Sequence, residues 1–213
     1  MRLVTYEHGG ARCGGLLLGE RIVALAELGA PAHSVRGVLE ALDRDELLAL
    51  GERAAASSAG IERVRATLLA PVPDPEKIIC LGLNYRDHAA ETGQEAPTAP
   101  MWFAKFANSL IGSGGEIVLP RAHPDCVDYE AELAIVIGRT ARNVEAPAAL
   151  HHVAGAMPFN DVSARDLQMQ NPLWTSGKAL TRTPPRMRLA AHRGALGAHG
   201  CAPARRKFLW LGR

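Results

Sequence analysis

The sequence predicts an α+β protein that is built mainly from β-strands. Short apolar runs recur along the chain, and most are bounded by glycine or proline, which is typical of strands. Residues 34–55 instead repeat apolar side chains at helical spacing. Three prolines within residues 71–75 form a stiff connector that ends a small leading domain. We therefore expect a small α+β domain over residues 1–70 and a larger, mainly β domain from residue 71 onward.

The leading domain combines strands with one helix. Its strand candidates are residues 3–6, 14–19 and 21–25. Glycines separate these runs, a pattern compatible with a meander or hairpins. The helix expected over residues 34–55 begins at Ser34, whose hydroxyl is a candidate N-cap. Residues 61–69 are expected to form a further helix or strand, and nothing in this domain carries a catalytic pattern.

The second domain alternates strands with polar turns. Its strand candidates are residues 77–82, 101–105, 128–138 and the first part of 157–166. Short helices are expected at residues 84–91 and 146–153, and a glycine-rich loop at 108–115. His151 and His152 fall at the end of the second helix, where we interpret them as surface residues.

Charge is distributed unevenly along the chain. All 22 acidic residues lie in residues 1–180 with 16 of the 24 lysines and arginines, which gives that part a formal charge of −6. The last 33 residues carry the other eight basic residues and no acidic residue, hence +8. The four cysteines lie far apart and form no C-x-x-C pair, so we expect reduced, structural thiols rather than a zinc ribbon or disulfide scaffold.

The strand over residues 128–138 begins acidic and ends apolar. Alternation places Glu130 and Glu132 on one face, with Cα atoms about 6–7 Å apart. Two carboxylates facing a poorly hydrated interior repel each other unless a divalent ion or a basic side chain neutralises them. The alternative is an edge strand whose first residues are simply solvated, and the E-x-E pattern alone does not decide between the two.

His88 and Glu91 form a second candidate pair. They are three residues apart, so on a helix they share a face and the carboxylate can orient the imidazole. That is the arrangement of a general base with its positioning residue. An ordinary surface ion pair has the same spacing.

Four linked motifs carry a family resemblance. They are G-L-N-Y-R-D-H at residues 82–88, D-Y-E-A-E-L-A at 128–134, N-D-V-S-A-R-D at 160–166 and G-K at 177–178. Their order and approximate spacing resemble the fumarylacetoacetate hydrolase family. The resemblance covers residues 71–180, and residues 1–70 are similar to the variable leading domain of many members.

The resemblance implies a metal centre. Members bind Mg²⁺ or Mn²⁺ through positions that correspond to Glu130, Glu132 and Asp161. Three carboxylates against a divalent ion leave positions on an octahedral ion for water and a chelating substrate. Lys178 matches the lysine that supports a developing oxyanion, and His88 with Glu91 matches the dyad that activates water in hydrolytic members.

The implied activity is metal-dependent hydrolysis of C–C bonds in short 2-oxo or 1,3-diketo acids of the acylpyruvate kind, through a stabilised enolate. An isomerase, decarboxylase or hydratase of the same family, as in 2-hydroxymuconate-type aromatic catabolism, is the alternative. A non-catalytic fragment is a third possibility. Arg86 and Arg165 are candidates for binding a substrate carboxylate, although structural ion pairs explain them equally well.

The implied fold is a mixed β-roll whose metal site lies in its mouth and which forms homodimers. Residues 71–180 supply only part of such a roll. Members continue after Gly-Lys with Asp-Thr-(Phe/Tyr)-x-Pro and further strands, whereas this chain has Thr-Arg-Thr-Pro-Pro at residues 181–185. Codons that encode Asp-Thr-Tyr-Ala-Pro encode Thr-Arg-Thr-Pro-Pro when their first base is lost. We therefore predict that residues 181–213 are translated out of frame and form a basic, non-periodic, disordered tail.

A nucleic-acid-binding extension is the competing interpretation of this tail. We favour the frame change, because the tail has no lysine-rich block and lies where the family needs core strands. The partners expected are therefore an oxo-acid substrate and a second copy of the chain, with neither nucleic acid nor membrane. No apolar run approaches the ~20 residues that span a bilayer, and we expect a soluble, cytoplasmic protein.

Overall fold

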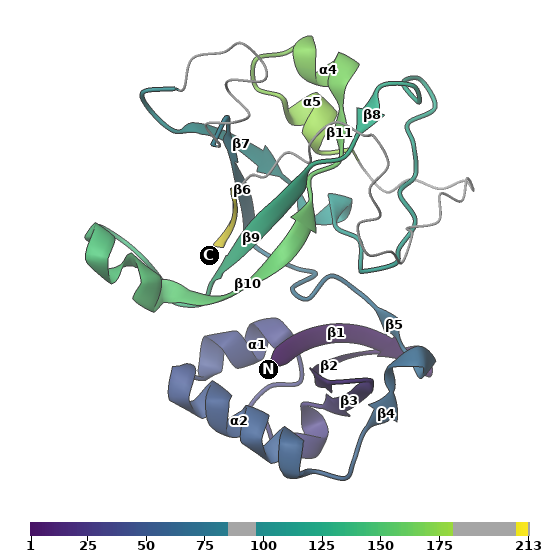
Figure 1. Ribbon diagram of the computed structural model, residues 1–213, viewed down its shortest axis with the longest axis vertical. Coiled ribbons are helices and arrows are strands. Elements are labelled where there is room, and N and C mark those ends of the chain that lie inside the picture. Colours follow the sequence, from purple (N-terminus) through teal and green to yellow (C-terminus); the bar gives the residue numbers. More distant parts are fainter. Residues whose placement is uncertain (85–96, 181–207, 213) are drawn as a thin grey trace, which may run out of the picture. The chain divides into compact units, whose positions relative to one another are not determined.

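The computed structural model describes residues 1–84, 97–180 and, for the backbone alone, 208–212. These residues form two compact units (Figure 1). The first unit comprises Met1–Asp74 together with Leu110–Glu116, and the second comprises Pro75–Ser109 and the chain from Ile117 onward. The first division therefore falls within the proline-rich connector. None of the helices in the described part of the chain is long and apolar enough to cross a bilayer.

The first unit holds an antiparallel sheet covered by two helices. The strand order is β4-β3-β2-β1-β5. The strands are β1 (Arg2–His8), β2 (Ala11–Leu18), β3 (Arg21–Ala24), β4 (Ile61–Glu62) and β5 (Thr67–Leu68). Residues 61–69, expected to be helix or strand, thus form two short strands around a 3₁₀ turn, Arg63–Arg65. The unit's core packs Leu16 and Val23 of the sheet against Val38 and Leu50 of the helices.

The single helix expected over residues 34–55 is two helices, so that prediction was wrong. Helix α1 (Val35–Ala41) begins at the expected cap, because the Ser34 hydroxyl accepts a hydrogen bond from the Gly37 N–H at 3.0 Å. Helix α2 (Arg44–Ala56) starts anew at Asp43. Asp43 and Glu46 form a reciprocal capping box, which ends the first helix and orients the second although the apolar spacing continues across the break.

The second unit holds the mainly β part of the molecule. Its sheet has the strand order β10-β9-β12-β6-β7. These strands are β6 (Lys77–Gly82), β7 (Met101–Lys105), β9 (Ala131–Ile137), β10 (Val153–Asn160) and β12 (Phe208–Gly212). Strands β9 and β10 lie side by side as one long antiparallel ribbon (Figure 1). Strands expected at 77–82 and 101–105 are confirmed.

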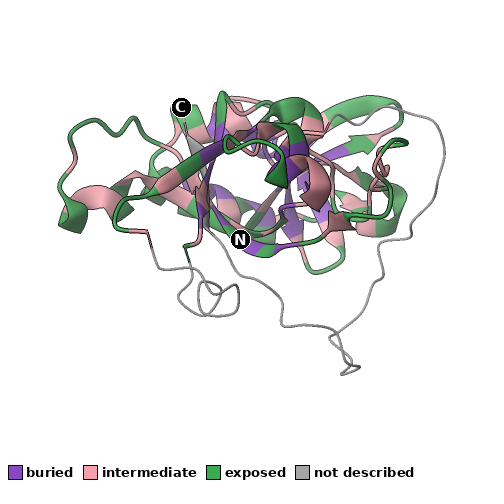
Figure 2. Ribbon diagram, turned by 90° about the horizontal axis from the view of Figure 1, so that it is seen from above, coloured by how far each residue is buried: buried purple, intermediate pink, exposed green. Residues whose placement is uncertain are grey.

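Shorter elements surround one end of that ribbon. Strands β8 (Val127–Asp128) and β11 (Ser163–Ala164) pair with each other, and helices α4 (Arg165–Met169) and α5 (Thr175–Lys178) follow. The strand expected over residues 128–138 is therefore interrupted at residues 129–130, between β8 and β9. The expected helix at 146–153 is the 3₁₀ segment η4 (Ala146–His152). In Figure 2 the buried residues concentrate along the strands, with exposed residues on the outer turns.

Strand β12 corrects part of the expectation for the tail. Residues 208–212 are not irregular: they pair in parallel with β9 and antiparallel with β6. A strand in this place satisfies backbone groups of β6 and β9 that would otherwise form open sheet edges.

Candidate metal centre

The pairing of β9 with β10 brings three carboxylates together. Glu130 immediately precedes β9, Glu132 lies within it, and Asp161 immediately follows β10. The antiparallel register places Asn160 opposite Ala131, and the Asp161 N–H donates to the Glu130 carbonyl oxygen at 2.9 Å. The side-chain oxygen of Asn160 also accepts from the Glu130 N–H at 3.2 Å. The ladder thus continues past the strand ends and sets the three acidic residues beside one another.

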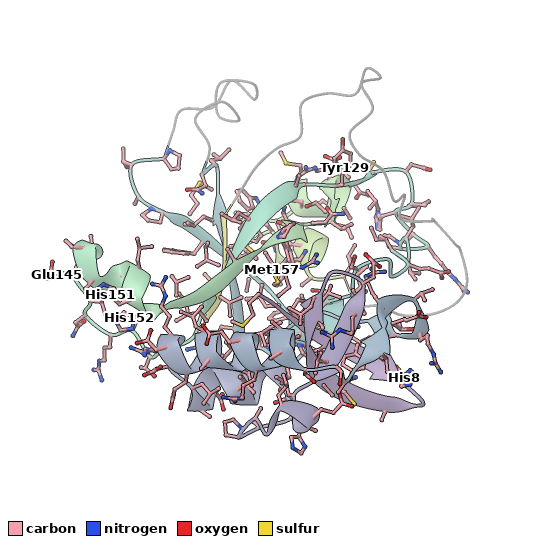
Figure 3. All side chains as sticks on the ribbon, turned by 60° about the horizontal axis from the view of Figure 1, so that its bottom comes forward. His8, Tyr129, Glu145, His151, His152 and Met157 are labelled. Carbon is pink, nitrogen blue, oxygen red and sulfur yellow. The ribbon has the colours of Figure 1, made fainter. Side chains whose placement is uncertain are left out.

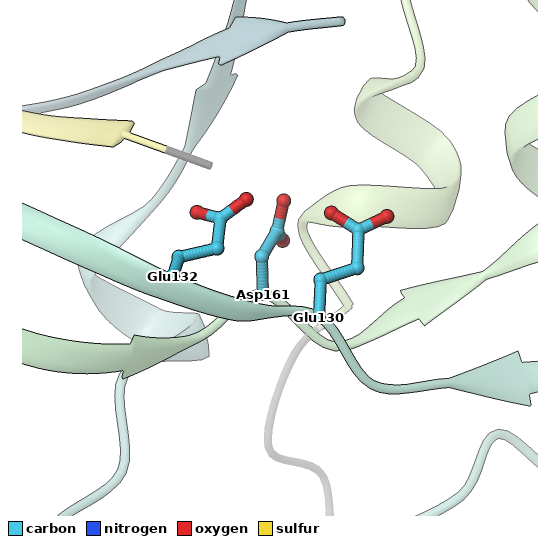
Figure 4. A group of neighbouring side chains, drawn as sticks. All are labelled: Glu130, Glu132 and Asp161. Atoms are coloured by element: carbon cyan, nitrogen blue, oxygen red, sulfur yellow. The ribbon is translucent and has the colours of Figure 1, made fainter. Parts of the chain in front are cut away.

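All three carboxylates are withdrawn from solvent. Glu130 and Asp161 are fully buried, and Glu132 is 7 % exposed. One oxygen from each lies within 4.8 Å of one from the others. Figure 4 shows the three side chains rising from the ribbon toward the same side. The expectation that Glu130 and Glu132 share an inward face is confirmed, and the solvated-edge alternative is wrong.

Lys178 lies between two of these carboxylates. Its Nζ is 2.9 Å from Glu130 Oε2 and 2.8 Å from Asp161 Oδ2, and the residue is fully buried. The ammonium also lies 5.0 Å from the centroid of the Phe103 ring, a cation–π distance. The structure therefore brings the predicted lysine to the predicted carboxylates, 17 residues or more apart in sequence.

Close backbone contacts explain why the residue before this lysine is a glycine. A Cβ atom at Gly177 would lie 2.5 Å from the Gln168 backbone nitrogen and 2.6 Å from the Ala164 carbonyl oxygen. Backbone atoms cannot move aside cheaply, so only glycine permits α5 to pack this closely against β11 and α4. The Gly-Lys motif is thus a packing requirement followed by a buried lysine that contacts two of the carboxylates.

Arg165 joins two acidic residues. Its Nη1 is 2.5 Å from Glu130 Oε1, and its Nε and Nη2 are 3.0 and 2.7 Å from Asp128 Oδ2. Burial by itself lowers the pKa of Arg165. The carboxylates of Glu130 and Asp128 raise it by more than burial lowers it, so the pKa lies above its usual value. The ion pairs anticipated for Arg165 are present, and its contact with a substrate carboxylate stays a prediction.

Lys105, Asp128 and Gln168 belong to the site but were not identified from the sequence. Lys105 is 5 % exposed and its Nζ lies 2.7 Å from Asp161 Oδ1. Gln168 Oε1 accepts from Arg165 Nη1 at 2.9 Å. The available signal for Lys105 was alternation, because it shares the buried face of β7 with Phe103. No comparable pattern marks the other two.

Other titratable groups lie near the centre. Burial raises the pKa of the Cys80 thiol, and the nearby charges of Asp161 and Glu132 raise it further against the opposing effect of two lysines. In the absence of a metal ion the Cys80 thiol is therefore protonated at neutral pH. His123 Nδ1 hydrogen-bonds Asp166 Oδ2 on α4.

The remaining predicted residues fall into two groups. Arg86, His88 and Glu91 lie outside the described residues, so the proposed dyad stays a prediction. His151 and His152 lie in η4 with Glu145, well apart from Tyr129 beside the acidic cluster (Figure 3). Their exclusion from the metal site agrees with this placement.

The donor set fits a hard divalent ion. Three buried carboxylates converge, and oxygen ligands of this kind are those that Mg²⁺ and Mn²⁺ prefer. Three basic side chains, Lys105, Lys178 and Arg165, contact the same group and offset its charge. Water-poor surroundings strengthen each of these electrostatic interactions.

Comparison with known proteins agrees with the fold and with the family resemblance. Residues 77–196, more than half of the chain, match the family model described as fumarylacetoacetate (FAA) hydrolase C-terminal. The chain therefore belongs to the fumarylacetoacetate hydrolase family, as the motifs indicated. The match extends past Leu180 into the segment for which we expect a change of reading frame, and that expectation stays a prediction.

Several curated relatives are oxaloacetate tautomerases by name. The chain is 42% identical over 134 residues to "Oxaloacetate tautomerase FAHD2A, mitochondrial" of Homo sapiens, which covers 62% of this chain and 42% of that protein. Its Rattus norvegicus counterpart, Fahd2a, is 41% identical over 144 residues, covering 66% and 46%. The chain thus spans less than half the length of these two relatives.

Solved structures share the architecture. A putative HpcE protein from Mycobacterium smegmatis superposes with a TM-score of 0.69 and 31% identity, covering 85% of this chain and 62% of that one. A probable 2-hydroxyhepta-2,4-diene-1,7-dioate isomerase from Mycobacterium abscessus gives 0.64 and 27%, with coverages of 85% and 60%. The maleylpyruvate hydrolase from Sphingobium sp. SYK-6, in complex with manganese(II) and pyruvate, superposes with a TM-score of 0.62 and 28% identity. The match covers 83% of this chain and 63% of that one.

Proposed function

We propose that this chain carries the metal centre of an enzyme that stabilises the enolate of a short 2-oxo acid, and that its reaction is keto–enol tautomerisation. The observation that carries the proposal is the convergence of Glu130, Glu132 and Asp161, with Lys178 hydrogen-bonded to two of them. Mg²⁺ or Mn²⁺ would be held by these three carboxylates and would supply Lewis-acid polarisation of the 2-oxo group. The manganese(II) and pyruvate in the Sphingobium hydrolase support both the ion and the substrate class.

The chain's own residues supply binding and charge. The ammonium of Lys178 has three N–H groups, and two of these are donated to carboxylates. The third can donate to the oxygen that becomes negative as the enolate forms, where burial increases its effect. Tautomerisation moves one proton from C3 to the 2-oxo oxygen, so that no other bond breaks and no co-reactant is needed.

C–C bond hydrolysis, the expectation from sequence, is the second candidate. The His88–Glu91 spacing and the Sphingobium hydrolase favour it. The names of the curated relatives favour tautomerisation instead, as does the isomerase among the solved structures. Both reactions pass through an enolate, so the described residues serve either one.

Two assays separate the candidates. With Mn²⁺ or Mg²⁺ present, the purified chain should accelerate the loss of the enol absorbance of oxaloacetate, and chelation of the ion should abolish this. Pyruvate release from acetylpyruvate, followed with a coupled dehydrogenase, would instead support the hydrolase. A chain that binds Mn²⁺ in calorimetry but turns over neither compound would be a non-catalytic fragment, and one that binds no Mn²⁺ would overturn the metal centre itself.

A homodimer and a cytoplasmic location remain proposals. Large apolar side chains on the second unit, among them Trp102, Phe106 and Leu173, are more than half exposed, and a second copy of the chain would cover such a surface. Light scattering of the purified chain tests this, with a monomeric mass as the contrary result. The human and rat relatives are mitochondrial by name, so fractionation of the source cells is the test of location.

A further inference from the structure

Lys105 and Lys178 differ in the groups that accept hydrogen bonds from their ammonium nitrogens. It is the last residue of β7, and its Nζ contacts three acceptors. These are Asp161 Oδ1 at 2.7 Å, the Val162 carbonyl oxygen at 3.2 Å and the Lys178 carbonyl oxygen. An ammonium group has three N–H donors, so each one has an acceptor. Lys105 therefore has no donor left for a substrate, and its effect on the chemistry must pass through the groups that it holds.

The two lysines hold opposite oxygens of one carboxylate. Lys105 contacts Asp161 Oδ1, whereas Lys178 contacts Oδ2. Two of the three acceptors of Lys105 are backbone carbonyls, which tie its ammonium to the turn after β10 and to the end of α5. Both acceptors of Lys178 are instead side chains of candidate ligands, Glu130 and Asp161. Of the two, Lys105 is the one that cannot follow a moving carboxylate.

We propose that Lys105 is a positioning residue that restricts Asp161 to one-oxygen coordination and thereby favours Mg²⁺ and Mn²⁺ over Ca²⁺. Both oxygens of Asp161 contact a lysine, but the ammonium on Oδ1 is also bonded to two backbone carbonyls. The ammonium on Oδ2 contacts only side chains that are themselves candidate ligands, so Oδ2 is the oxygen that can turn to an ion. Small octahedral ions accept single-oxygen carboxylates, whereas Ca²⁺ takes six to eight oxygens and gains from carboxylates that bind through both. This inference rests on the metal centre proposed above and adds a selectivity determinant to it.

Charge alone does not give this selectivity. Removing Lys105 makes the centre more negative, which strengthens binding of every divalent ion. Freeing Oδ1 adds one ligand atom, which benefits Ca²⁺ in particular. The ratio of Mn²⁺ to Ca²⁺ affinity therefore isolates coordination from charge, and a purely structural role of Lys105 would not move it.

The test is calorimetric titration of the chain with Mn²⁺ and, separately, with Ca²⁺. Lys105→Met removes the ammonium while it keeps the length of the aliphatic stem, and Lys77→Met, at the exposed first residue of β6, is the matched control. We expect the Mn²⁺:Ca²⁺ affinity ratio to fall about tenfold in K105M, the scale found for groups that orient metal ligands, and to stay unchanged in K77M. An unchanged ratio in K105M overturns the inference but leaves the metal centre intact, whereas absence of Mn²⁺ binding by the wild-type chain overturns both.

A second measurement needs no variant, in case K105M does not fold. Crystals of the wild-type chain grown with Mn²⁺ should show the ion bonded to one oxygen of Asp161, with Oδ1 still on Lys105. Coordination through both oxygens, or a Lys105 ammonium that has left Oδ1, would refute the inference.

Discussion

The backbone N–H of Asp161 donates to the carbonyl oxygen of Glu130 at 2.9 Å, 31 positions apart in the chain. This bond lies just beyond the last strand pair of β9 and β10 and closes the end of the ladder. Because side chains on adjacent strands are separated by only about 5 Å, the carboxylates of the two residues are forced to be neighbours. The convergence of the carboxylates is thus a consequence of strand register.

Replacement of Lys178 by methionine should lower stability and sharpen the response to metal. The variant leaves two facing buried carboxylates without their shared ammonium, and loss of one partner from a buried ion pair costs about 3–5 kcal/mol. Mn²⁺ would then stabilise K178M more than it stabilises the wild type, since the ion replaces the missing charge. Thermal unfolding with and without Mn²⁺ measures both effects, and a smaller Mn²⁺ shift in K178M than in the wild type would contradict this account.

Gly177→Ala should disrupt the site by packing alone. The added methyl group meets two backbone atoms at 2.5 and 2.6 Å, and overpacking of this kind costs about 1–3 kcal/mol. Gly155→Ala is the matched control, because a Cβ there meets nothing within 4 Å. Urea unfolding of the two variants gives the comparison. Equal urea midpoints for the two variants would show that α5 can move aside for the added methyl group at little cost.

Arg165→Lys should weaken the site although it conserves the charge. The guanidinium bridges Glu130 and Asp128 through three different nitrogens, and a lysine ammonium cannot reproduce that planar fork. We expect a loss of about 2 kcal/mol in the free energy of unfolding, within the range for broken buried or half-buried charge pairs. Exposed Arg142→Lys should be neutral in the same urea titration. If R165K had the same free energy of unfolding as the wild type, the planar geometry of the guanidinium would not contribute to stability.

Stability should fall as Asp166 is protonated. Burial acts to raise the pKa of Asp166, but hydrogen bonds from the Leu167 N–H and from His123 outweigh it and hold the pKa below its usual value. A carboxyl group whose pKa is lower in the folded state stabilises the fold above its unfolded pKa, about 3.9, and that contribution disappears as pH falls through the folded value. The stability difference between wild type and Asp166→Asn should therefore be constant from about pH 5 upward and shrink below about pH 4. Urea titrations across this pH range measure that difference. A stability difference that grows on acidification would contradict the prediction.

Part of the carboxylate cluster was predictable from local patterns, because alternation places Glu130 and Glu132 on one strand face. Asp161 and Lys178 were named through the motifs of the family. The structure brings the four side chains together, and their roles stay predictions. Lys105 was overlooked because a lysine at a strand end is ordinarily solvated, and only its burial against Asp161 distinguishes it. The break at Asp43 was missed for a related reason, since apolar spacing continues through a cap that ends the helix.

Patterns within a few residues thus determined the strands at 77–82 and 101–105, the leading cap at Ser34 and the shared face of Glu130 and Glu132, because alternation and capping depend on neighbours in sequence. The tertiary structure alone decided which oxygen of Asp161 faces which lysine, how Arg165 bridges Asp128 to Glu130, and that residues 208–212 enter the sheet between β6 and β9. Those relationships join segments up to 135 positions apart, as between Lys77 and Gly212. Contacts at such separations form only when the sheet is assembled, and no local preference encodes them.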